Sequence, residues 1–104
     1  MSLVAKIKIE VNMDMLQDVC DSLSHISCHL SNQRESKAFV NALELICDKL
    51  LKKQLSKRHE TKKFKLTFDF IEAHFLEMYL IIYNSAYNVY NIQLVINQLN
   101  QKLA

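Results

Sequence analysis

The chain contains no glycine and no proline. Phosphate-binding loops and dinucleotide-binding turns need glycine where the backbone approaches the ligand closely, so both kinds of nucleotide site are excluded. The G-x-S-x-G nucleophile elbow and the Asn-Gly hairpin turn are excluded for the same reason. Turns must instead be made by asparagine and serine, which tolerate unusual backbone angles better than most residues. These absences favour a compact, helix-rich architecture.

Long apolar runs and paired cysteines are also missing. No run reaches the roughly 18 residues that a membrane span needs, and no signal-peptide pattern is present. The three cysteines, Cys20, Cys28 and Cys47, are odd in number and form no C-x-x-C pair, which argues for a reducing compartment. We therefore expect a cytoplasmic protein without membrane contact, and the sequence indicates no cofactor.

Two short segments alternate strictly between apolar and polar residues. Residues 5–11 place Ile7, Ile9 and Val11 on one side, and residues 62–68 place Phe64, Leu66 and Phe68 on one side. Such alternation predicts two half-buried strands. The segments match at an offset of 57 residues, and the residues that follow them, Asn12 and Asp69, are both good helix N-caps. We interpret this match as an internal repeat.

Apolar residues at helical spacing predict four helices. The first follows Asn12 and runs to about Leu30; the second opens at Asn32 with Glu35 and runs to about Leu55. The third opens at Asp69 and runs to about Tyr83, where Asn84 and Ser85 break the pattern. It is apolar around most of its circumference, so it must lie centrally or face a partner chain. The last helix carries Val89, Ile92, Ile96, Leu99 and Leu103 on one side.

The predicted fold is a helix-dominated α+β domain of order β-α-α-β-α-α, with two short strands packed on four helices. We expect one domain over residues 1–104, built as a pseudo-repeat of two βαα halves, 4–56 and 62–104, around the polar linker 56–62. Two strands alone are marginally stable in water. A homodimer that joins two sheets, or that covers surplus apolar helix surface, is therefore expected.

Charge is distributed unevenly along the chain. Residues 49–65 hold eight basic residues and one acid, whereas the rest of the chain holds five basic and ten acidic residues. If the strands pair, one positive surface can form, with like charges facing each other across the sheet. Nucleic acid would relieve that repulsion. Its candidate residues are Lys6, Lys8, Lys57, Arg58, Lys62, Lys63 and Lys65. The alternative is a solvated face, or one that meets an acidic protein.

Metal binding and catalysis are weaker hypotheses. Asp21, His25 and His29 recur at a spacing of four and carry ligand types that zinc uses, but no second cluster completes a site. Cys28 lies beside His29, yet adjacent helix residues do not face each other, and no oxyanion-hole loop is visible. We therefore predict no metal site and no enzymatic activity.

Tyrosines recur at helical spacing near the C-terminal end. Because tyrosine is enriched at interfaces, the interface candidates are Tyr79, Tyr83, Tyr87, Tyr90 and Leu94. The alternative is core packing with a wet hydroxyl group. The sequence as a whole favours a non-enzymatic interaction or regulatory module that binds another protein, with nucleic-acid binding as the alternative.

Overall fold

The computed structural model describes residues 6–25, 34–57, 59 and 61–103. Its elements follow the predicted order β-α-α-β-α-α. They are β1 (Ile7–Val11), α1 (Met13–Leu23), α3 (Arg34–Ser56), β2 (Phe64–Phe68), α4 (Phe70–Tyr87) and α5 (Tyr90–Leu103). The helix-dominated α+β class is therefore confirmed. No helix in these ranges is long and apolar enough to cross a membrane.

The two strands form an antiparallel sheet of order β1-β2. The register pairs Ile7 with Phe68, Ile9 with Leu66 and Val11 with Phe64. All six of these apolar side chains are buried, as the alternation predicted. The side chains between them point to the opposite face, which is open to solvent because the helices cover only the apolar one.

This register gives the sheet local two-fold symmetry. Ile9 faces Leu66, which is its own equivalent under the 57-residue offset. When a residue of one antiparallel strand faces its own equivalent in the other, a local two-fold axis between these two residues relates the two strands. Both strands also run directly into capped helices: the Asn12 side chain accepts from the Met15 N–H, and the Asp69 side chain accepts from the Glu72 N–H. The repeat thus extends through strand, cap and helix.

The predicted ends of the first and third helices are wrong. α1 ends at Leu23, earlier than Leu30, and a turn follows at Ser24 and His25. The proposed cap at Asn32 lies outside the described residues. α3 ends at Ser56, as the periodicity predicted, and it buries Leu43, Ile46 and Leu50.

α4 continues through Asn84 and Ser85 and ends at Tyr87. The helix is not broken at Asn84 because that side chain is buried and accepts from the Val89 N–H, across the helix end. The break falls instead at Asn88, whose φ of 53° and ψ of 50° are left-handed. Asparagine adopts this conformation more readily than other non-glycine residues, so it replaces the missing glycine.

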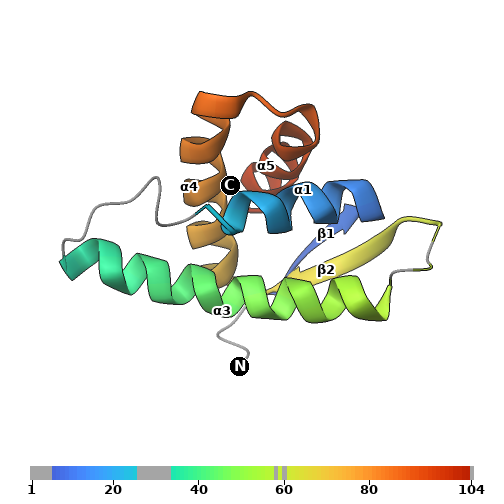
Figure 1. The fold of residues 1–104 in the computed structure, drawn as a ribbon, viewed down its shortest axis with the longest axis horizontal. Coiled ribbons are helices and arrows are strands. Elements are labelled where there is room, and N and C mark those ends of the chain that lie inside the picture. Colours follow the sequence, from blue (N-terminus) through green and yellow to red (C-terminus); the bar gives the residue numbers. More distant parts are fainter. Residues whose placement is uncertain (1–5, 26–33, 58, 60, 104) are drawn as a thin grey trace.

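One core joins all six elements. α5 packs against β1, α1 and α4, while α3 packs against α1 and α4. In Figure 1, α3 crosses the lower side of the molecule and α4 rises beside the other helices. α4 is central through Leu76, Tyr79 and Leu80, yet it also leaves Phe70, Ile71, Met78, Ile81 and Ile82 exposed.

Candidate binding groove between α3 and β2

The outward lysines of the sheet are exposed, but no two of them face each other. Lys8 lies opposite Thr67, and Lys65 lies opposite Glu10. The expectation of like charges facing each other across the sheet is therefore wrong, because the antiparallel register sets each lysine against a neutral or acidic residue. Lys6, Lys62 and Lys63 are also exposed, Lys57 is half-buried, and Arg58 lies outside the described residues.

Three lysines gather around a hollow on the outer face of the sheet. Lys8, Lys65 and Lys102 line a space of about 390 Å³ together with Ile9, Glu10 and Gln98. Lys102 belongs to α5 and was not among the predicted residues. Only the packing of α5 along β1 brings it here, and that contact leaves no local signal in the sequence.

The outer edge of β1 is closed by one side chain of α5. The Gln98 amide accepts from the Glu10 N–H at 2.8 Å and donates to the Glu10 carbonyl at 2.7 Å. Since both backbone groups of Glu10 point away from β2, the pair Glu10–Lys65 is a non-hydrogen-bonded pair of the ladder. Gln98 thus takes the place that another strand would occupy.

The outer edge of β2 is open as far as the described residues are concerned. Lys65 belongs to a non-hydrogen-bonded pair. Because hydrogen-bonded and non-hydrogen-bonded pairs alternate along an antiparallel ladder, Thr67, two residues on, belongs to a non-hydrogen-bonded pair as well. The N–H and C=O groups of both residues therefore point away from β1. Within the described ranges, no side chain closes this edge as Gln98 closes the other, because α3 makes little backbone contact with β2 whereas α5 packs closely along β1. The two-fold symmetry is broken at this position.

A groove of about 610 Å³ fills the space that this asymmetry leaves. Its lining comes from one side of α3 and from the open edge of β2: Leu45, Asp48, Lys49, Leu50, Lys52, Lys53, Ser56, Lys65, Leu66, Thr67 and Phe68. Leu45 is the one exposed leucine of this lining, since Leu50, Leu66 and Phe68 are buried beneath it, and lysines provide most of its charge. Leu45 is 71% exposed, so a partner in the groove can contact it.

The lysines of the groove differ in what they contact. Lys49 forms an ion pair with Glu72 at 3.1 Å, and its Nζ lies 5.0 Å from the centre of the Phe68 ring. Among the described residues, Lys52, Lys53 and Lys65 form no ion pair. Asp48 is the one carboxylate in the lining. The groove therefore has an excess of positive charge that the rest of the described chain does not neutralise.

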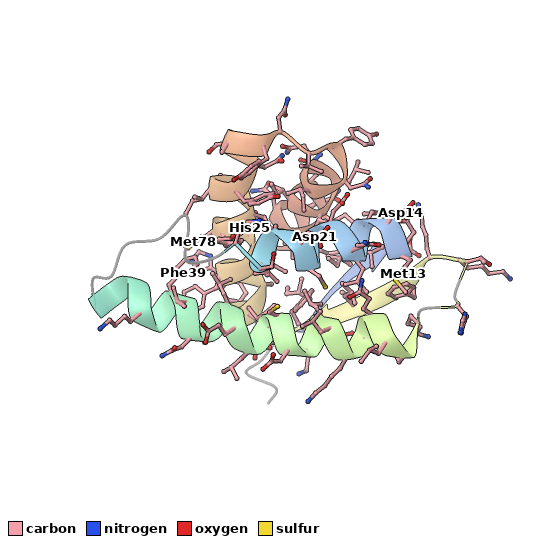
Figure 2. All side chains as sticks on the ribbon, viewed as in Figure 1. Met13, Asp14, Asp21, His25, Phe39 and Met78 are labelled. Carbon is pink, nitrogen blue, oxygen red and sulfur yellow. The ribbon has the colours of Figure 1, made fainter. Side chains whose placement is uncertain are left out.

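The predicted metal residues are only partly described. Asp21 and His25 lie on α1 and in the turn after it, both exposed (Figure 2), while His29 lies outside the described residues. His25 Nδ1 lies 2.9 Å from the main-chain oxygen of Asp21, not from its carboxylate. No group of three His, Cys, Asp or Glu side chains that could hold a metal occurs in the described part of the chain.

The two described cysteines are packing residues. Burial, with smaller contributions from Cys47 and Asp21, raises the pKa of the Cys20 thiol from its usual 9.0 to about 11. Burial is also the main cause that raises the pKa of Cys47. Both thiols are therefore protonated at neutral pH, and a protonated thiol is a poor nucleophile. Cys28 lies outside the described residues.

The tyrosines run from the core to the surface. Tyr79 is fully buried and donates a short hydrogen bond to the Ser22 carbonyl, while Tyr83 is buried and stacks on Tyr87 at 4.5 Å between ring centres. Burial, with nearby Tyr87, raises the pKa of Tyr83. Tyr87 and Tyr90 are exposed, and Leu94 is half-buried. Tyr79 and Tyr83 hold the helices together from inside, so a partner can reach Tyr87 and Tyr90 but not these two.

Fold and groove together define a small, helix-dominated α+β domain in which Gln98 closes one sheet edge and no described residue closes the other. Comparison of the chain with known protein families, with curated proteins and with solved structures finds no significant match. The function must therefore be argued from the groove itself.

Proposed function

We propose that this protein is a non-enzymatic interaction module that binds another protein in the groove between α3 and β2. The open edge of β2 carries the proposal. A strand edge with unpaired backbone groups is a ready template for another chain, and here it lies beside apolar side chains and lysines. The polar groups are spread along an edge and do not converge on one point, which suits the binding of a chain better than catalysis on a small substrate.

Two double variants with the same change of charge test this proposal. L45E/K53E changes two groove residues, and K37E/L55E makes the same changes on exposed parts of α3 outside the groove; Leu45 and Leu55 are 71% and 70% exposed. Proteins retained from a nuclease-treated extract are compared by quantitative mass spectrometry. We expect a set of proteins that wild type and K37E/L55E retain and L45E/K53E loses. If the groove variant retains everything that the wild type does, the proposal fails.

Nucleic-acid binding is the second candidate. The gathering of Lys8, Lys65 and Lys102 favours it, since several lysines close together can neutralise phosphates. Glu10 lies within the same hollow and opposes it. No aromatic side chain of the two strands is exposed for base stacking, because Phe64 and Phe68 are buried. Binding of a labelled oligonucleotide that weakens steeply with added salt would support this candidate.

The homodimer is retained as a proposal, with α4 as the contact surface. Phe70, Ile71, Met78, Ile81 and Ile82 are between 39% and 65% exposed, although each is large and apolar. Ile71, Met78 and Ile82 lie along one side of the helix at a helical spacing. Because these side chains carry no charge, two copies of the surface do not repel each other, unlike two copies of the groove.

A further inference from the structure

We infer that the groove binds an acidic, extended segment of another protein, which adds to the open edge of β2 as a third strand. The inference rests on the proposed function and names the chemistry of the partner. Extended peptides bind in this way where a sheet edge is exposed, with main-chain hydrogen bonds for affinity and alternate side chains for specificity.

The backbone of β2 offers hydrogen bonds on this side. Lys65 and Thr67 each direct one N–H and one C=O away from β1, since Lys65 faces Glu10 and Thr67 faces Lys8 in non-hydrogen-bonded pairs. An added strand with residues opposite Lys65 and Thr67 can exchange both bonds with each of them. The other edge of the sheet, at β1, is closed by Gln98, so an added strand can pair with β2 but not with β1.

The side chains of the added strand must alternate. Those opposite Lys65 and Thr67 point to the outer face of the sheet, beside the Lys65 side chain. The residue between them points the other way, as Leu66 does, toward the apolar side of the sheet. The groove thus matches a segment in which acidic and aliphatic residues alternate.

The positive charge of the groove favours an acidic segment over a second copy of this chain, and the buried Phe68 ring disfavours a nucleic acid. Lys52, Lys53 and Lys65 have no ion-pair partner among the described residues, and the single carboxylate Asp48 does not balance them. A second copy of this chain would bring its own Lys65 to the same edge, and like charges directly opposite one another destabilise a sheet. The Phe68 ring lies under Lys49 and is fully buried, so it offers no surface to a nucleobase.

Defined peptides test the inference by fluorescence anisotropy. The probe is a labelled seven-residue peptide of alternating glutamate and valine. Three controls accompany it: a scrambled peptide of the same composition, an alternating lysine–valine peptide, and the probe with N-methyl groups on alternate amides, which removes strand pairing but keeps every side chain. We expect the probe to bind, and each control to bind at least about tenfold more weakly.

Protein variants locate the peptide. T67P removes the outward N–H of Thr67, and it leaves the ladder intact because this N–H does not point to β1. K53E and K65E reverse charge within the groove, while K37E does so on the same helix outside it. T67P, K53E and K65E should each weaken probe binding by about tenfold or more, and K37E by less than about twofold. Should T67P fail to fold by circular dichroism, the N-methylated peptide makes the same test without altering the protein.

The outcomes separate this inference from the proposed function. Equal binding of the N-methylated or the lysine–valine peptide overturns the inference, as does tighter binding of a labelled oligothymidylate that displaces the probe. Absence of probe binding overturns it too, but the proposed function stands if L45E/K53E still loses proteins that K37E/L55E retains. Probe binding that K53E, K65E and T67P leave unchanged places the ligand elsewhere and also overturns it.

Discussion

At the scale of single residues, the Tyr79 hydroxyl joins the two halves of the repeat. Tyr79 and Ser22 are equivalents under the 57-residue offset, and the hydroxyl of one donates to the carbonyl of the other inside the core. The ring itself is fully buried. The Ser22 carbonyl lies in the last turn of α1 and also accepts from the His25 N–H at 3.2 Å, so the Tyr79 hydroxyl is a second donor to this helix end.

Y79F should therefore lower the free energy of unfolding by about 1 kcal/mol, since it removes one buried hydrogen bond and keeps the ring. Urea denaturation followed by circular dichroism measures the change. Y90F is the matched control because the Tyr90 ring is 75% exposed, and it should leave stability unchanged. Equal stability of Y79F and wild type would show that the bond contributes nothing.

The Cys20 thiol makes stability depend on pH. Its pKa is about 11 in the folded protein against the usual 9.0, so the folded state holds the proton more tightly than the unfolded state. The resulting stability is complete below about pH 9 and is lost as the pH rises toward about 11. The loss is on the order of 1–3 kcal/mol for a shift of this size.

C20A removes this titration and keeps a small apolar residue. We expect the unfolding free energy of the wild type to fall more than that of C20A between about pH 8 and about pH 10.5, in the presence of a reductant. Tyr83, whose pKa is also raised, remains in both proteins and cancels in the comparison. Parallel pH profiles for the two proteins would contradict the assignment to Cys20.

At the scale of the elements, α5 stabilises β1 through the Gln98 amide. This one side chain satisfies both outward backbone groups of Glu10. Q98A should lower the unfolding free energy by about 1 kcal/mol, because these exposed bonds are replaced by bonds to water. Q101A, an exposed glutamine of the same helix, is the control and should have no effect. Amide hydrogen exchange measures both effects. The Glu10 N–H should exchange faster in Q98A than in wild type or Q101A, and unchanged exchange there would be contrary evidence.

The elements also show what the sequence could predict. Strands 7–11 and 64–68, and the caps at Asn12 and Asp69, depend on alternation and on short-range hydrogen bonds, so local patterns revealed them. The end of α4 was missed because Asn84 is buried and bonds across the turn to Val89, a contact that composition does not show. The groove was missed for a similar reason: it depends on how far α3 stands from β2, and only tertiary packing sets that distance.

At the scale of the whole molecule, the groove and the exposed apolar surface of α4 occupy different places. The uncompensated lysines border the groove and the outer face of the sheet, whereas the exposed apolar side chains of α4 lie on a separate helix. A ligand in the groove and a second copy on α4 therefore use different surfaces. The molecule can in principle hold both at once, so that a dimer would present two grooves.

The mass of the protein in solution tests the proposed dimer through α4. We expect light scattering after gel filtration to give about twice the monomer mass of 12.2 kDa. I71E/I82E should return the protein to the monomer mass, because two charges buried in an apolar contact are strongly unfavourable. L55E is the control, since Leu55 is similarly exposed but lies on α3. A wild-type protein that is monomeric at every concentration up to millimolar would refute the dimer, and a monomeric L55E would move the contact from α4 to α3. In either case the peptide titration remains informative, because the groove lies on α3 and β2 of a single chain.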